Sequence, residues 1–215
     1  MMPSLVALTR RNVFVSGAAV LALGGCGSLL GPSGPPAQIY RLDPVFPAPS
    51  PGPPVSWQLA VARPLSSQTL DTERIALVRG AAMDYFADAQ WNDSVPRLVQ
   101  ALLVDAFERS GRILAVARES EGVRADYMIE TEIRDFDAQY ATENGAPTVV
   151  VDIMARLLGA HGAVIASRNV RLSQPAGANS VANVVTAFDQ ALGATLEQVV
   201  DWTLQAPAPA HSELR

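Results

Sequence analysis

Proline is concentrated in one part of this 215-residue chain, since nine of its sixteen prolines lie between Gly31 and Pro54. Proline fixes the backbone angle φ at about −65° and lacks an N–H donor, so this stretch favours extended polyproline II structure and excludes a helix. One interruption, QIYRLDP, is expected to form a short edge strand over residues 38–43. The pattern predicts a tether over residues 26–54 and a folded domain over residues 55–204.

The only cysteine, Cys26, stands directly before the proline-rich stretch. It follows two arginines, Arg10 and Arg11, and a run of apolar or small residues that ends at Gly25, which is the layout of a secretory signal. The run is shorter than the roughly 20 residues needed to span a bilayer. Its last residues and the cysteine, LGGC, resemble the bacterial lipobox, whose cysteine receives acyl chains such as palmitate. We therefore expect residues 1–25 to be a signal peptide and Cys26 to carry a lipid anchor.

Two features around Cys26 bear on export and sorting. TRRNVFV resembles a twin-arginine export signal, and the sequence leaves this route and the general secretory route open. Gly27 follows the cysteine, at the position where enteric-type sorting uses an aspartate to keep a lipoprotein in the inner membrane. We therefore expect an anchor in the outer membrane with the domain facing the periplasm. The alternative to lipidation is a buried or incidental cysteine in an N-terminal segment.

The charge of the chain argues against nucleic acid as a partner. Cleavage before Cys26 removes two of the 16 basic residues and none of the 21 acidic ones, which leaves 14 against 21 and a net charge of −7. A protein that binds nucleic acid needs a basic surface to attract the phosphates. The roughly 160 residues after the proline-rich stretch are enough for one domain with an adequate core.

Two stretches have apolar residues at helical spacing. The first covers residues 92–111, with Asp93 or Ser94 as the candidate N-cap, Pro96 in the first turn and Gly111 at the left-handed end. The second runs from about Ser180, a candidate N-cap, to Leu204. The tail, residues 205–215, alternates alanine with proline and then becomes polar, so we expect it to be disordered.

Alternation of apolar and polar residues predicts the strands of the domain. Phe136 has the wrong parity for its strand, which predicts a bulge. The last four strands are expected to form an antiparallel meander. The fold class is therefore α+β, with a largely antiparallel or mixed sheet and two helices packed on one face. The predicted strands cover residues 55–64, 73–80, 82–91, 112–119, 125–140, 146–160 and 163–174.

Catalytic motifs are missing from the sequence, which has no G-x-S-x-G, H-E-x-x-H, C-x-x-C or phosphate-binding glycine loop. Its two histidines fall in a predicted turn, His161, and in the tail, His211. Carboxylates between residues 119 and 137 alternate with apolar residues, as on a solvated strand face. We predict no metal, no cofactor and no enzyme activity; the alternative is a hydrolase that uses Asp126 or Glu130.

Large apolar side chains gather in MDYFADAQWND, just before the first predicted helix. They are Met83, Tyr85, Phe86 and Trp91. Such residues form protein cores, and they are also enriched at protein interfaces. We predict that some of them contact a partner or a neighbouring subunit, with Trp91 as the member that best fits a core position beside the helix.

These residues together resemble a known family. The lipobox, the proline-broken tether, YRLDP, LAVARP, LDTERIALV and MDYFADAQWNDSVPRLVQALLVDAFERSG are similar to the ABC-type transport auxiliary lipoproteins, a paraquat-inducible protein C-like family. The resemblance covers residues from Tyr40 to Trp202. The aromatic pair before Trp91 and the leucine-rich helix that follows are its most specific part, while the second half matches in layout only.

The resemblance implies a function outside catalysis. Members of this family serve mammalian-cell-entry (MCE) transport systems, which move phospholipids or other lipids between the two membranes with an inner-membrane ATPase. We therefore expect an outer-membrane lipoprotein that docks an MCE-domain protein, forms a homo-oligomer and has lipid as candidate cargo. Two alternatives stay open at this point: an assembly lipoprotein resembling the plug of lipopolysaccharide export, and an anchored periplasmic hydrolase.

Overall fold

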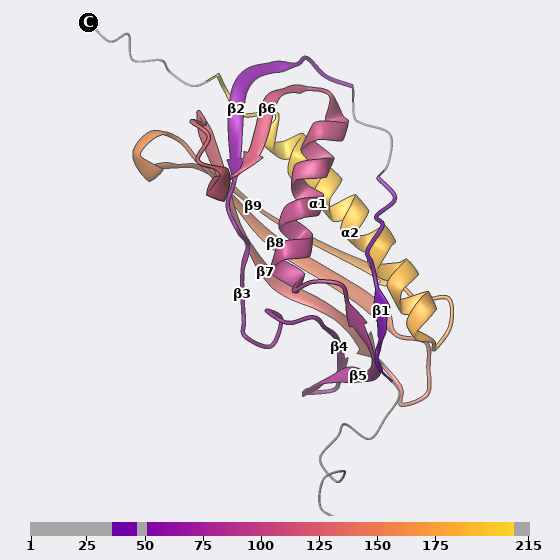
Figure 1. The fold of residues 1–215 in the computed structure, drawn as a ribbon. Coiled ribbons are helices and arrows are strands. Elements are labelled where there is room, and N and C mark those ends of the chain that lie inside the picture. Colours follow the sequence, from indigo (N-terminus) through magenta and orange to yellow (C-terminus); the bar gives the residue numbers. More distant parts are fainter. Residues whose placement is uncertain (1–35, 47–50, 209–215) are drawn as a thin grey trace, which may run out of the picture. The chain divides into compact units, whose positions relative to one another are not determined.

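The computed structural model describes residues 36–46 and 51–208, which lie in a compact unit that begins at Pro36. The predicted signal peptide, Cys26, the residues up to 35 and the tail beyond residue 208 lie outside the described residues. Within the described part, nine strands form one sheet and two α-helices lie across one of its faces (Figure 1). This α+β fold with a mixed sheet is the predicted fold class.

Both predicted helices are present, as α1 (Val95–Ser110) and α2 (Val181–Thr203). In α1, Pro96 occupies the first turn, where its missing N–H costs nothing, and Gly111 ends the helix with a left-handed φ of 60°. In α2 the hydroxyl of Ser180 accepts a hydrogen bond from a backbone N–H of the first turn. Gly111 therefore ends α1 and Ser180 caps the start of α2, as predicted, while Ser94 occupies the N-cap position of α1 without a side-chain hydrogen bond.

The strands follow the predicted stretches closely, and one further strand of two residues was not predicted. Short 3₁₀ turns, Glu119–Glu121 and Ala160–Gly162, precede β7 and connect β8 to β9. The strands are β1 (Gln38–Tyr40), β2 (Val55–Val61), β3 (Leu65–Ser66), β4 (Arg74–Arg79), β5 (Ala82–Trp91), β6 (Ile113–Arg118), β7 (Tyr127–Tyr140), β8 (Thr148–Leu158) and β9 (Val164–Pro175).

The longest strand, β7, organises the sheet. Along one edge it pairs in parallel with three short strands in succession, β2, β3 and β4. Along its other edge it pairs antiparallel with β8, which pairs antiparallel with β9. The predicted meander is confirmed for β7, β8 and β9 and is wrong for β6, which pairs in parallel with β2. Alternation within a strand specifies its two faces and carries no information about its neighbour. The sequence therefore did not predict that β6 pairs with β2.

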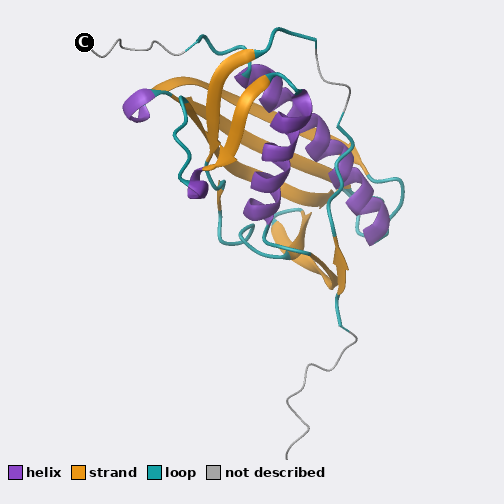
Figure 2. Cartoon of the chain, turned by 45° about the horizontal axis from the view of Figure 1, so that its top comes forward, coloured by secondary structure: helices purple, strands orange, loops and turns teal. Residues whose placement is uncertain are grey.

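The two helices cover the same face of the sheet (Figure 2). Helix α2 packs against β8 and β9, and α1 packs against β6 and α2. The predicted bulge in β7 is confirmed, because the register with β8 shifts between Ile133 and Asp135. The extra residue, Arg134, returns Phe136 to the covered face, where its ring lies 4.7 Å from that of Phe188 in α2.

Residues before the first long strand also pack on the domain. Strand β1 confirms the short strand predicted in QIYRLDP and pairs in parallel with the end of β5. Leu42 is part of the core, and the N–H of Asp43 donates to the carboxylate of Asp189 in α2 at 2.7 Å. At Gly193 of α2 a Cβ atom would lie 2.6 Å from the carbonyl oxygen of Val45. Glycine at this position therefore lets the segment cross the helix.

Candidate functional site

The predicted contact residues lie on and beside the hairpin formed by β4 and β5. Gly80, in the turn, has a φ of 59°, a conformation that glycine adopts without strain. Met83 pairs with Val78 and Tyr85 with Ala76 across the hairpin. Among the described residues the outer edge of β5 has a strand neighbour only at its end, where β1 pairs with residues 89–91. The first part of β5 is therefore an open sheet edge.

A long bulge divides β5 into two parts. Tyr85 pairs with Ala76 and Gln90 with Arg74, so that residues 86–89 stand opposite the single residue Ile75. Bulges of this kind bend an edge strand and change the direction of its side chains. The bulge therefore separates the exposed start of β5 from its buried end.

Tyr85 is held in a defined position. Its hydroxyl donates to the carbonyl oxygen of Thr69 at 3.0 Å, and the guanidinium carbon of Arg74 lies 3.7 Å from its ring centroid. The side chain is half-buried, as is that of Phe86, while Met83 is 41% exposed. These three residues, Met83, Tyr85 and Phe86, are called the hairpin surface below.

Trp91 belongs to the core and not to a contact surface. It is 1% exposed, and its ring lies 5.2 Å from Phe188 and 6.2 Å from Phe136 in edge-on arrangements. A side chain with so little accessible area has no surface to offer a partner. The prediction of Trp91 as a contact residue is corrected, and its assignment as the core member of the group is confirmed.

The two carboxylates of the hydrolase alternative are not brought together. Asp126 accepts a hydrogen bond from the N–H of Gln58 at 2.8 Å and donates its own N–H to the carbonyl oxygen of Gln58. The strand from Tyr127 to Glu130 alone spans about 10 Å, because an extended chain rises roughly 3.3 Å per residue. These two hydrogen bonds of Asp126 hold β2 beside the start of β7.

His161 lies in the turn between β8 and β9, as predicted. It is exposed and has a φ of 59°, a left-handed conformation that histidine adopts more readily than most residues. The described residues contain no group of three or more histidine, cysteine, aspartate or glutamate side chains that fits a metal ion.

One finding concerns membranes. In the part of the chain that the structure describes, neither helix is long and apolar enough to cross a bilayer.

Two surface cavities were not predicted. One, of about 440 Å³, is mostly apolar and lies beside Ile165, Trp202 and Pro207. The other, of about 400 Å³, is bordered by Arg63, Arg97 and Arg118. These arginines come from three elements that are far apart in sequence, and each has the sequence context of an ordinary surface arginine. No local signal would have found them.

Comparison with known proteins places the domain in a family. Residues 40–200 match the family model described as the ABC-type transport auxiliary lipoprotein component. The protein bll6063 of Bradyrhizobium diazoefficiens is 35% identical over 152 residues, which make up 71% of this chain and 41% of that protein. The chain therefore spans less than half the length of this curated relative.

Solved structures agree on the fold. The crystal structure of XCC0632 from Xanthomonas campestris, a DUF330 protein, has a TM-score of 0.73 and 33% identity, and the match covers 78% of this chain and 95% of that chain. An uncharacterized protein of known crystal structure has a TM-score of 0.62 at 14% identity and covers 79% of this chain and 99% of its own. At that identity the second likeness shows the fold alone. By its match over residues 40–200, the chain belongs to the ABC-type transport auxiliary lipoprotein component family.

Proposed function

We propose that this auxiliary lipoprotein is a non-catalytic component of an MCE-type transport system and docks the MCE-domain protein through the hairpin surface. Phospholipid or another lipid is the cargo of that system. The single observation that carries the docking role is the accessible apolar surface at the start of β5, where Met83 is exposed and Tyr85 and Phe86 are half-buried against the core. Its residues Met83, Tyr85 and Phe86 stand on an open sheet edge and keep accessible area that the Trp91 end of the same strand lacks.

An open strand edge with apolar side chains suits a protein partner. Its unpaired backbone N–H and C=O groups can extend the sheet with a strand of the partner, and its side chains supply the apolar contact. Tyr85 is fixed by Thr69 and Arg74, so less side-chain freedom is lost when a partner binds. Aromatic residues and methionine are also the types enriched at the centres of interfaces.

The anchor completes the proposed role. A triacylated Cys26 in the outer membrane holds the domain on the periplasmic side. Mass spectrometry of the mature N-terminus and membrane fractionation test this part. An unmodified cysteine behind a retained residue 1–25 segment, or recovery with inner-membrane markers alone, contradicts it.

The docking role is tested by co-purification with the MCE-domain protein encoded in the same genome. The wild-type lipoprotein should bring this protein down, and the combined substitution Met83→Ser with Phe86→Ala should reduce its recovery. Leu114→Ala is the matched control, because Leu114 is 63% exposed on β6, at the opposite end of the strand order. Equal recovery with all variants contradicts a contact at the hairpin surface.

The alternative contact for the hairpin surface is a neighbouring copy of this chain, in place of the MCE-domain protein. Size-exclusion chromatography with light scattering gives the mass of the purified lipoprotein directly. A homo-oligomer is expected, and a monomer at micromolar concentration contradicts this part of the proposal.

A further inference from the structure

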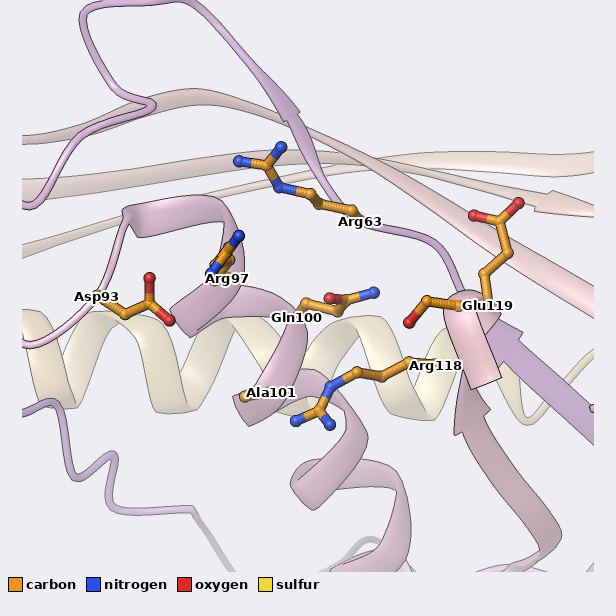
Figure 3. A pocket seen from close by; sticks show the side chains of 8 residues that line it. Arg63, Asp93, Arg97, Gln100, Ala101, Arg118 and Glu119 are labelled. Carbon is orange, nitrogen blue, oxygen red and sulfur yellow. The ribbon is translucent and has the colours of Figure 1, made fainter. Parts of the chain in front are cut away.

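The arginine-bordered cavity lies between the start of α1 and the ends of β2 and β6. Arg63 follows β2, Arg97 is in the first turn of α1, and Arg118 is the last residue of β6. Figure 3 shows Arg63 and Arg118 on opposite sides of Gln100, with Arg97 close by on α1. The volume of about 400 Å³ lies within the range of small-molecule sites.

The three arginines differ in whether they form an ion pair with a carboxylate. Arg63 donates to both carboxylate oxygens of Asp71, at 2.8 and 3.0 Å. Arg118 lies 3.6 Å from Glu121, and both side chains are about half exposed, so this pair is weak. Arg97 has no ion pair or hydrogen bond to its guanidinium within residues 36–46 and 51–208. Arg97, which is exposed, is therefore the cavity arginine without an ion-pair partner among the described residues.

Two carboxylates line the same cavity. Asp93, a candidate N-cap in the sequence, instead accepts a hydrogen bond from the N–H of Ser94 at 2.7 Å through one carboxylate oxygen. Glu119, in the 3₁₀ turn after β6, has no ion pair in the described part of the chain. The cavity is thus bordered by charges of both signs that form no ion pair with one another within the described residues. A simple anion would be attracted by Arg97 and repelled by the two carboxylates.

Gln100 supplies a buried polar side chain to the lining of the cavity. It is buried, and its Nε2 donates to the carbonyl oxygen of Val61 at 3.0 Å, which holds the amide between α1 and β2. Two guanidinium groups on different elements, Arg97 and Arg118, can each bind a separate oxygen of a tetrahedral phosphate. A planar carboxylate has only two oxygens in one plane and is satisfied by one guanidinium.

We propose that this cavity binds a zwitterionic phosphate ester, with its phosphate at Arg97 and Arg118 and its ammonium group at Asp93 or Glu119. Phosphoethanolamine is the smallest molecule with this charge pattern. It comes from two sources, the free ester and the headgroup of a phospholipid. The site is separate from the hairpin surface and does not depend on the docking role.

The direct test is titration of the full mature lipoprotein in detergent with O-phosphoethanolamine, inorganic phosphate and ethanolamine. Saturable binding of O-phosphoethanolamine is expected, about tenfold tighter than that of either part alone, because a hydrogen-bonded charge contact contributes about that factor. Inorganic phosphate binding as tightly as the ester overturns the zwitterionic assignment. Tighter binding of β-alanine, which has a carboxylate in place of the phosphate, also overturns it.

Charge-specific variants locate the site. Arg97→Gln and Arg118→Gln should each weaken O-phosphoethanolamine binding by about tenfold with unchanged melting. Asp93→Asn keeps the oxygen that accepts from Ser94; either this variant or Glu119→Gln should weaken binding of the ester and strengthen binding of inorganic phosphate. Arg168→Gln is the matched control, since Arg168 is an exposed arginine on β9 outside the cavity. Equal loss in this control, or no loss in both cavity variants, overturns the proposal.

A competition experiment separates the two sources. Phosphatidylethanolamine dissolved in the same detergent should displace bound O-phosphoethanolamine if the site takes a lipid headgroup, while phosphatidylglycerol in that detergent should not. If neither lipid competes, the ligand is the free ester. Displacement by phosphatidylglycerol equal to that by phosphatidylethanolamine shows that the ammonium group is not recognised and overturns the proposal.

Discussion

The two ends of β5 contain the same kinds of residue in opposite surroundings. At the far end, Trp91 is enclosed by Phe136, Phe188 and the neighbouring strand β1. At the near end, Met83 and Tyr85 have β4 on one side and no strand on the other within the described residues. The bulge between them separates a core position from a surface position within ten residues of chain.

This difference teaches that the role of an aromatic residue depends on what lies beside its strand. Trp91 is covered because β1 and α2 come from distant parts of the sequence and close over it. Tyr85 stays partly exposed because nothing in the described chain pairs with its edge. The comparison therefore predicts large stability effects at one end of β5 and large association effects at the other.

Trp91→Ala should give the largest effect on stability. Truncation of a buried aromatic ring removes its transfer free energy and leaves a cavity, at a cost of about 3–5 kcal/mol. Among the described residues the indole nitrogen has no hydrogen-bond partner, so packing accounts for the loss. Thermal and urea unfolding measure it. A loss near that of Tyr85→Ala would remove the distinction between the two ends.

Gly193→Ala tests whether the segment before β2 covers the buried end. The new Cβ meets the carbonyl oxygen of Val45 at 2.6 Å, so the segment must shift. Overpacking costs about 1–3 kcal/mol, which exceeds the roughly 1 kcal/mol that alanine gains over glycine in a helix. We expect a net loss of up to about 2 kcal/mol. In a variant that lacks residues 36–46, the same substitution should stabilise the domain.

Asp137, on the strand beside the hairpin, should make the stability of the domain depend on pH. It is 2% exposed on β7, and burial raises the pKa of its carboxyl above the ordinary value of 3.8, partly opposed by a hydrogen bond from Gln139. Compared with the unfolded chain, the native state therefore favours the protonated carboxyl. The free energy of unfolding falls as pH rises through the raised pKa. Asp137→Asn should raise the melting temperature at pH 7, with a smaller gain near pH 4.5. A gain independent of pH would show that the carboxyl does not titrate in this range.

Tyr85→Ala should lower stability much less than Trp91→Ala. It removes one hydrogen bond to Thr69 and the stacking of Arg74, which together are worth about 1–2 kcal/mol at a half-buried site. Tyr85→Phe keeps the ring and should recover the stacking part. If Tyr85→Ala unfolds the domain at room temperature, the residue is a core member.

Met83→Ser should have the smallest effect on stability, within about 0.5 kcal/mol, because exposed positions away from special contacts tolerate substitution. Chemical unfolding of the variant beside wild type measures it. A loss above about 2 kcal/mol would assign Met83 to a packed position.

Local features of the fold were predictable and long-range ones were not. The helix ends at Gly111 and Ser180 and the bulge before Phe136 depend on residues within a few positions of one another. The parallel neighbours of β7 depend on which strands meet, and β6 was therefore placed wrongly. In the site, Trp91 was predictable as core from the helix beside it. The cavity around Arg97 was not, because its charges meet only after folding.

The most direct test of the account is the dissociation constant of the purified lipoprotein and its MCE-domain partner, measured together with melting. The combined variant Tyr85→Ala with Phe86→Ala should bind at least about tenfold more weakly, because interface aromatics often contribute more than 1 kcal/mol each, and should still melt cooperatively. Leu114→Ala should bind like wild type. Unchanged affinity in a folded hairpin variant would contradict the claim that the exposed end of β5 is the docking surface.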